Sequence, residues 1–251
     1  MRCGRSCQKL CVCPREFARK LIVVNSEPEH FSKEISPNVT AGGEPRAGRN
    51  VRCVALFVSL ILAVLIGDLL LKAWSFDRVA GQSVVFPENL RGSALFESIP
   101  AHEPWVVVPY VLNLRLTLNT GAVFGLGKGG RSFFVFVSLV AVAAIGWIFW
   151  RSAARDKTHH AALALILGGA LGNLYDRLRF GAVRDMMHLL PDVHLPFGLA
   201  WPGGTTEVYP WIFNLADVAL VVGVLLLFVV MWQHEKQQQQ KQKQAEQTAP
   251  N

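Results

Sequence analysis

The chain has 251 residues, of which 51% are hydrophobic, and its formal net charge is +7. Its mean hydropathy of +0.31 is too apolar for an ordinary soluble domain. The composition therefore favours a membrane protein. The positive charge fits contact with anionic lipid headgroups and gives no reason to invoke nucleic acid.

Four apolar stretches account for this composition, at residues 54–71, 132–150, 161–175 and 211–232. A helix needs about 20 apolar residues to cross a bilayer. Runs of this length with so few charges favour lipid over the interior of a large soluble protein, which is the alternative interpretation. The pattern predicts transmembrane helices over about 54–72, 132–150, 158–176 and 211–232, which together form one domain at residues 54–232.

Basic residues near the ends of these stretches predict the orientation. Four spans place both termini on one side, and positively charged residues mark the cytoplasmic side. The segments expected there contain Arg46, Arg49, Arg52, Arg151, Arg155, Lys157, Lys236, Lys241 and Lys243. The opposite side is not free of bases, because Arg177, Arg179 and Arg184 lie there. We expect both termini to be cytoplasmic.

The two ends of the chain have the composition of disordered segments. Residues 1–53 contain Gly, Pro, Ser and scattered charges without periodicity, and residues 233–251 are rich in Gln and Lys. The first segment also contains Cys3, Cys7, Cys11 and Cys13. Their spacing does not match the common zinc patterns, so a metal or redox cluster competes with the simpler interpretation of reduced thiols on a tail.

An alternating pattern between the first two spans predicts a β-strand. Leucine occupies every second position there, at Leu112, Leu114, Leu116 and Leu118. Such alternation is typical of a half-buried strand, and this one ends in a turn that contains Asn119 and Gly121. The predicted fold is an all-α membrane protein with four transmembrane helices and a small extracytoplasmic β-platform. Residues 178–210 are expected to form a loop.

The polar residues of the predicted spans converge at one depth, near the outer face. They are Asp68 and Lys72 in the first span, Asn173, Asp176 and Arg177 in the third, Asp185 in the following loop, and Asn214 and Asp217 in the fourth. At 1.5 Å per residue, Asp217 is expected about 9 Å inside its helix. A carboxylate at membrane depth is costly and is usually functional, so the convergence predicts one shared site.

These residues also have structural alternatives. Asp68 and Lys72 are four residues apart and could form an ion pair at a helix end, with the lysine reaching toward the headgroups. Asp176 beside Arg177 could mark the point where the third span leaves lipid. Asn173 could join helices by hydrogen bonds.

Two neighbouring aspartates offer one particular chemistry. They cannot both ionise cheaply, so they share a proton and their pKa values separate. The ionised carboxylate activates water, and the protonated one polarises a carbonyl and later protonates the leaving amine. This is peptide hydrolysis without a metal, and the sequence contains neither Gly-x-Ser-x-Gly nor His-Glu-x-x-His.

A proton-coupled transporter is a second hypothesis, because it too needs acids in the membrane. Transporters place such acids near the midplane, often within repeated halves. Here the acids gather at one face and no repeat is visible, which favours the hydrolytic interpretation.

Five sequence blocks carry a family resemblance. In chain order they are Asp68-x-x-x-Lys72, Asn119-x-Gly121-Ala122-x-Phe124, Gly169-x-x-Gly172-Asn173-x-x-Asp176-Arg177, Gly181-x-Val183-x-Asp185 and Phe213-Asn214-x-Ala216-Asp217. They resemble the motifs of bacterial lipoprotein signal peptidase, also called signal peptidase II. The resemblance covers residues 54 to about 232.

The resemblance implies an intramembrane aspartyl endopeptidase of the bacterial inner membrane, with its active site near the outer face. It would cut signal peptides from prolipoproteins just before a cysteine that carries diacylglyceryl, with no metal or cofactor. By motif position, Asp185 and Asp217 are expected to be the catalytic dyad. The expected substrate-binding or site-shaping residues are Asp68, Lys72, Asn119, Gly121, Asn173, Asp176, Arg177 and Asn214. The implied partners are prolipoproteins, membrane lipids and inhibitors of the globomycin type.

The chain departs from the family pattern around Asp185. Arg184 precedes the aspartate where an apolar residue is more usual, and Met186 follows it. The arginine would either lower the pKa of Asp185 or point to lipid headgroups. Residues 187–210 form a longer stretch than is typical, which is expected to reshape the loop over the site. An inactive family member that serves as a lipid-binding scaffold is a further alternative.

Overall fold

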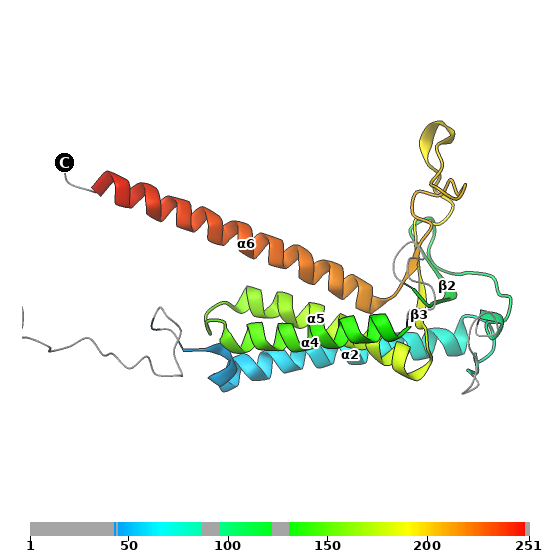
Figure 1. The fold of residues 1–251 in the computed structure, drawn as a ribbon. Helices are drawn as coiled ribbons and strands as arrows, with labels where there is room; N and C mark the ends of the chain where they lie inside the picture. Colours follow the sequence, from blue (N-terminus) through cyan, green and yellow to red (C-terminus); the bar gives the residue numbers. More distant parts are fainter. Residues whose placement is uncertain (1–42, 44, 87–95, 122–130, 249–251) are drawn as a thin grey trace, which may run out of the picture. The chain divides into compact units, whose positions relative to one another are not determined.

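The computed structural model describes residue 43 and residues 45–86, 96–121 and 131–248. The cysteines at positions 3, 7, 11 and 13, and the motif residues Ala122 and Phe124, lie outside these ranges. The described elements, labelled in Figure 1 where there is room, are the 3-10 helices η1 (Ala47–Arg49) and η3 (Pro196–Gly198), the helices α2 (Val51–Arg78), α4 (Arg131–Arg151), α5 (Lys157–Arg179) and α6 (Leu215–Thr248), and the strands β1 (Trp105–Val108), β2 (Leu112–Asn119), β3 (Val183–Leu189) and β4 (Ile212–Phe213).

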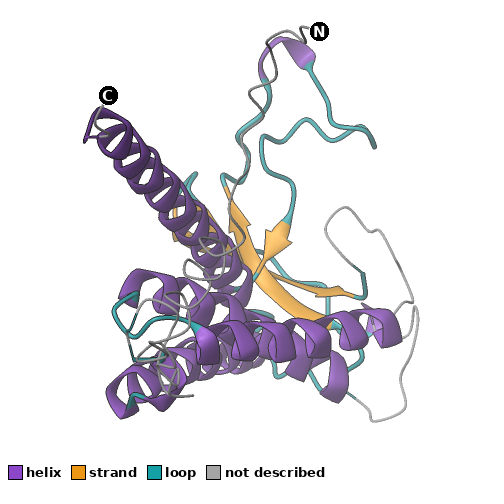
Figure 2. Ribbon diagram, turned by 60° about the vertical axis from the view of Figure 1, so that its left-hand side comes forward, coloured by secondary structure: helices purple, strands orange, loops and turns teal. Residues whose placement is uncertain are grey.

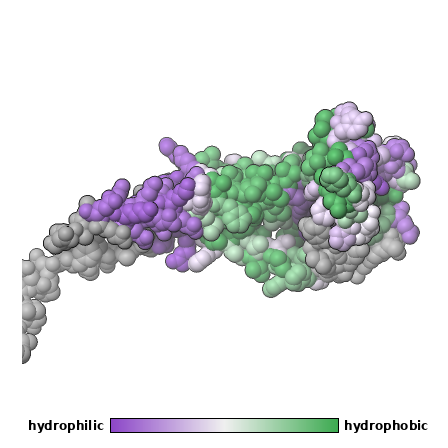
Figure 3. All heavy atoms as spheres, turned by 90° about the horizontal axis from the view of Figure 1, so that it is seen from above, coloured by the Kyte–Doolittle hydropathy of each residue, from purple (hydrophilic) through white to green (hydrophobic). Residues whose placement is uncertain are grey.

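Within the described ranges, three helices are long and apolar enough to cross a membrane: α2, α4 and α6. They contain the predicted spans 54–72 and 132–150 and most of the span 211–232. Large apolar side chains on their surfaces are exposed, among them Leu56, Phe133, Trp147 and Phe228. Figure 3 shows the resulting hydrophobic surface over the helices, next to the hydrophilic end of α6.

Helix α5 contains the third predicted span, 158–176, but does not meet the same standard of length and apolar composition. At 23 residues it is about 35 Å long, which would suffice to cross a bilayer. It packs against α2, α4 and α6, and it buries His160, Asn173 and Asp176. Because three neighbours cover it, α5 can be more polar than a helix that faces lipid. Composition therefore does not establish it as a fourth span.

Glycines allow the close packing of α5 against its neighbours. A Cβ atom on Gly169 would collide with the backbone oxygen of Ala216 and press on the side chain of Leu220, both in α6. A Cβ atom on Gly172 would collide with the carboxylate of Asp68 in α2. Small residues at such positions let helix backbones approach one another in membranes.

The four strands form one antiparallel sheet in the order β1-β2-β3-β4, which lies at one end of the helices (Figure 2). Three of the alternating leucines of β2, Leu114, Leu116 and Leu118, are buried. They pack with Phe76 of α2 and Met186 of β3. The predicted strand and small sheet are therefore confirmed. The prediction of a loop for residues 178–210 is wrong for residues 183–189, which form β3.

Part of the predicted N-terminal tail belongs to the folded body. The amide of Ala47 donates to the backbone oxygen of Ser152 at 2.9 Å, and the amide of Ala154 donates to that of Pro45 at 2.9 Å. Ala47 is fully buried. Residues 45–50 therefore dock beside the α4–α5 connection, and residues 51–53 begin α2, so the prediction of disorder for residues 1–53 is wrong for this part.

Helix α6 continues to Thr248, well beyond the end of the predicted span at residue 232. The prediction of a disordered tail is therefore wrong for residues 233–248. Gln, Lys and Glu, which dominate this stretch, are good helix formers. An apolar helix that already exists gives them a nucleus from which the helix can extend.

The packing of α5 against α6 yields a test of the fold. Gly169→Ala is expected to lower the stability of the protein by about 1–3 kcal/mol, because the new methyl group overpacks the contact with α6. Gly146→Ala is the matched control, since a Cβ at Gly146 in α4 meets nothing within 4 Å. Thermal unfolding in detergent measures both, and equal melting temperatures would contradict the close approach of the two helices.

Candidate functional site

Asn214 and Asp217 cap the N-terminus of α6 by reciprocal hydrogen bonds. The Asp217 amide donates to Asn214 Oδ1 at 3.0 Å, and the Asn214 amide donates to Asp217 Oδ2 at 3.1 Å. This is the geometry of a capping box. Because α6 begins at Leu215, Asp217 lies in the first helical turn. The expectation that it lies about 9 Å inside its helix is wrong, because residues 212–213 form β4 instead of helix.

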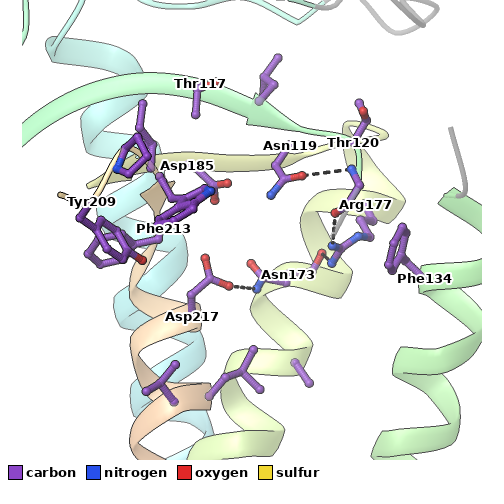
Figure 4. A pocket seen from close by; sticks show the side chains of 18 of the residues that line it. Thr117, Asn119, Thr120, Phe134, Asn173, Arg177, Asp185, Tyr209, Phe213 and Asp217 are labelled. Carbon is purple, nitrogen blue, oxygen red and sulfur yellow. Dashed lines mark hydrogen bonds between the residues drawn. The ribbon is translucent and has the colours of Figure 1, made fainter. Parts of the chain in front are cut away.

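Asp185, in the sheet, also contacts Asn214. It lies in β3, between β2 and β4, and is 1% exposed. Asn214 Nδ2 donates to Asp185 Oδ1 at 2.6 Å, and the side chain of Asn119 at the end of β2 also hydrogen-bonds to Asp185. Asn214 therefore contacts both aspartates, one through its side-chain amide and the other through its backbone amide and side-chain oxygen. In Figure 4 the two carboxylates face a common space.

Asn173 of α5 connects Asp217 to the interior of the bundle. Its Nδ2 donates to Asp217 Oδ1 at 2.8 Å. Its Oδ1 accepts two hydrogen bonds, from Asn214 Nδ2 at 3.1 Å and from Lys72 Nζ at 3.1 Å. Both ends of the amide are thus in use, which fixes its orientation. A predicted helix-bridging residue is here also a direct partner of a predicted catalytic residue.

Below Asn173, the buried ammonium of Lys72 pairs with two carboxylates. Its Nζ lies 2.7 Å from Asp68 Oδ2 and 3.3 Å from Asp176 Oδ2, and all three side chains are fully buried. Asp68 Oδ1 accepts the backbone amide of Ala216 in α6 at 2.9 Å. The alternative of a lysine reaching toward headgroups is therefore wrong. The cluster ties α2, α5 and α6 together directly under the two aspartates.

Arg184 lies beside Asp185 in sequence but points to the other face of β3, as successive strand residues do. Its Nε and Nη2 donate to Asp176 Oδ1 at 3.2 and 2.8 Å, and its backbone amide donates to Asp176 Oδ2 at 3.0 Å. Its guanidinium lies 4.4 Å from the centroid of the Phe180 ring. Both interpretations of Arg184 from the sequence are therefore wrong: it neutralises Asp176 and is buried.

A cleft of about 1330 Å³ opens at the two aspartates. Arg177 lies on its wall, where Nη2 donates to the backbone oxygen of Gly121 at 3.3 Å and the guanidinium lies 5.1 Å from the Phe134 ring. Asn119 Oδ1 accepts the amide of Gly121 at 3.0 Å, which closes the turn after β2. Arg177 and Gly121 thus lie together in the lining of the cleft.

One wall of the cleft is aromatic, and the sequence reasoning missed it. Trp201 packs edge-on against Trp211, which contacts Tyr209, which in turn contacts Phe213. All four residues line the cleft. Burial, followed by the charge of Asp217, raises the pKa of Tyr209, so its hydroxyl stays available as a donor. The signal in the sequence was aromatic clustering within 201–213, a composition typical of a membrane interface.

The environment of Asp185 favours its protonated form. Burial, followed by the negative charge of Asp217, raises the pKa of Asp185 to about 7. The hydrogen bonds from Asn214 and Asn119 oppose this shift without cancelling it. Asp217 instead lies in the first turn of α6, where it accepts hydrogen bonds from Asn173 and from the Asn214 amide. The two carboxylates are thus placed in different environments.

The family of the chain follows from comparison with known proteins. The family model described as signal peptidase (SPase) II matches residues 60–233. The chain belongs to the signal peptidase II family. It is accordingly a multi-pass membrane peptidase of lipoprotein processing, and the resemblance seen in the sequence motifs is confirmed.

Individual relatives agree with the family model. The chain is 33% identical over 181 residues to a lipoprotein signal peptidase of Latilactobacillus sakei, covering 72% of this chain and 96% of that protein. It is 33% identical over 153 residues to one from Syntrophotalea carbinolica, covering 60% and 86%. Two solved structures, each described as a bacterial membrane enzyme, share the fold at 23% identity with TM-scores of 0.53 and 0.50. They cover 72% and 71% of this chain and 89% and 93% of their own chains.

The ion pair between Arg184 and Asp176 can be tested by unfolding. Arg184→Met is expected to destabilise the protein by about 3 kcal/mol, because it removes one partner of a buried charge. Arg179→Met is the control, since Arg179 is an exposed arginine that also lies over Phe180, at 5.6 Å. Thermal unfolding in detergent compares the two. Similar losses in both variants would show that contact with the Phe180 ring, and not the ion pair, is what Arg184 contributes.

Proposed function

We propose that this chain is an aspartyl endopeptidase that removes signal peptides from diacylglyceryl-modified prolipoproteins, cutting just before the lipidated cysteine. The observation that supports it best is the placement of Asp185 and Asp217 at one cleft, both hydrogen-bonded to Asn214. Membership of the signal peptidase II family and the lipoprotein signal peptidases among its relatives point to the same substrates.

In the proposed reaction, the dyad holds one proton, on Asp185. Asp217 takes a proton from a water molecule, and the oxygen of that water forms a bond with the scissile carbonyl carbon. At the same time, Asp185 donates its proton to the carbonyl oxygen. The resulting gem-diol collapses as the carbon–nitrogen bond breaks. Asp217 gives its proton to the leaving amine, and Asp185 recovers a proton from a hydroxyl of the gem-diol. Each carboxyl acts once as acid and once as base.

Substrate is proposed to enter from the bilayer, through the part of the cleft that lies between α4 and α6. This part is lined by Val137 and Ala141 of α4, Ala170 of α5, and Leu220 and Val221 of α6. An apolar channel between two lipid-facing helices suits the acyl chains and the apolar segment of a signal peptide. Cyclic peptides of the globomycin type are proposed to occupy the same cleft, in line with the family resemblance.

The proposed setting is the bacterial inner membrane, with α5 as the fourth span and both termini cytoplasmic. Helix α5 runs from the α4–α5 connection, where η1 docks, to the sheet, and its 23 residues exceed the 21 of the lipid-facing α4. The bases Arg52, Arg151 and Lys157 then lie at the cytoplasmic end, as the positive-inside rule requires. The dyad lies at the opposite, extracytoplasmic end.

Removal of either carboxylate tests the dyad. Asp185→Asn and Asp217→Asn are each expected to lower the rate of prolipoprotein cleavage by ~10³-fold or more, because each removes one partner in proton transfer. Asp192→Asn is the matched control, since Asp192 is an exposed acid in the loop after β3. Purified protein is assayed with a diacylglyceryl-modified prolipoprotein. Cleavage by either dyad variant at the parental rate would disprove the assignment.

The raised pKa of Asp185 predicts the alkaline limb of the pH profile. Because Asp185 must be protonated, kcat/KM should fall as the pH rises above about 7. Asn214 donates a hydrogen bond that favours the ionised form of Asp185. Asn214→Ala should therefore raise that pKa and move the alkaline limb to higher pH, whatever it does to the maximal rate. A limb that stays in place, or moves to lower pH, would contradict the assignment of Asp185 as the acid.

A further inference from the structure

A second cavity lies at the end of the bundle opposite the dyad. It has a volume of about 710 Å³ and is lined by α2 and α5, with Leu56, Phe57 and Leu60 on one side and Ala161 and Ala164 on the other. The side chain of Phe57 is held in place at the base of the cavity, because its ring stacks on that of Phe149 of α4 with centroids 3.8 Å apart. The groove extends along α2 from residue 52 to residue 60, about 12 Å. It has the character of a slot for a hydrocarbon chain.

The mouth of this groove is basic. Arg52 and Lys157 line it, both exposed, and among the described residues that form the lining there is no acid. Neither of the two cations has an ion-pair partner in the part of the chain that the structure describes. An apolar slot with two unneutralised cations at its mouth matches the chemistry of a lipid with an anionic headgroup.

Three neutral polar side chains of the lining, those of Asn50, Cys53 and His160, already have partners. Asn50 Oδ1 accepts the amides of Arg52 and Cys53 at 3.0 and 3.3 Å. The Cys53 thiol contacts the backbone oxygen of Ala154 at 3.3 Å, and His160 Nε2 lies 2.8 Å from the Ser152 hydroxyl. A headgroup at the mouth would therefore be bound chiefly by charge, through Arg52 and Lys157.

We propose that this groove binds an anionic phospholipid, with an acyl chain between α2 and α5 and its phosphate between Arg52 and Lys157. Basic pockets between transmembrane helices on the cytoplasmic side are typical sites for anionic headgroups. The assignment to the cytoplasmic leaflet rests on the orientation proposed above. The binding itself rests only on the groove and its charges, and is independent of the peptidase reaction.

Native mass spectrometry of the purified full-length protein tests the proposal. The protein is incubated with equal amounts of phosphatidylglycerol and phosphatidylcholine and is expected to retain phosphatidylglycerol in preference. The double variant Arg52→Ala/Lys157→Ala is expected to lose ~30-fold in affinity, from about 1 kcal/mol for each basic side chain. The matched control is Arg151→Ala/Lys236→Ala, which removes the same charge from side chains that lie over Trp147 and Trp232.

A second variant separates the groove from surface charge. Ala161→Trp fills the slot without changing the charge, and it is expected to abolish retention of phosphatidylglycerol. Retention by Ala161→Trp, or an equal loss in the control double variant, would show that anionic lipid is held by surface charge alone and would overturn the proposal. Displacement of the lipid by millimolar inorganic phosphate would overturn it as well, because the acyl chain would then contribute nothing.

The readout keeps this proposal separate from the proposed peptidase function. Lipid retention is measured without prolipoprotein. The protein can therefore cleave prolipoprotein without retaining lipid, or retain lipid without cleaving prolipoprotein. Arg52→Ala/Lys157→Ala is expected to cleave prolipoprotein in detergent at the parental rate, since both residues lie at the far end of the bundle from the dyad. An absence of selectivity between the two lipids in the parent protein would itself disprove the lipid site.

Discussion

The burial of charge at one end of the helix bundle is the constraint on which the site depends. A buried ammonium, that of Lys72, is tolerable only with partners of opposite charge and good geometry. Asp68 and Asp176 supply them, and Arg184 neutralises what remains on Asp176. These contacts join α2, α5 and β3 below the dyad. The helices cannot shift independently without unpairing a buried charge, so the polar layer acts as a rigid base for Asp185 and Asp217.

The dyad itself is divided between two kinds of structure, which gives its members different environments. Asp185 is held in the sheet, where burial favours the proton. Asp217 is held in the first turn of α6, where a backbone amide and a side-chain amide donate hydrogen bonds to its carboxylate. Asn214 bonds to both and so couples the end of the sheet to the start of the helix. One residue thereby sets the relative placement of the two carboxylates.

The two cavities of the bundle lie toward opposite ends of α5. Helix α5 carries the polar residues and is covered by α2, α4 and α6, which provide the apolar surface toward lipid. Toward its C-terminal end, Asn173 bonds to Asp217, and at its N-terminal end Lys157 lines the basic groove. The arrangement therefore makes α5 the shared wall of both cavities.

The sequence by itself determined the apolar helices, the alternating strand and the set of polar residues that belong together, because hydrophobic periodicity and motif spacing are local properties. Whether a side chain points to one face of β3 or the other, as with Arg184 and Asp185, depends on the register of the sheet. Strand β3 is buried on both faces for most of its length and has no alternating pattern, so it was mistaken for a loop. The start of α6 was placed too early because β4 is only two residues long. Only the tertiary structure decided these points, since each depends on pairing between segments that are far apart in the chain.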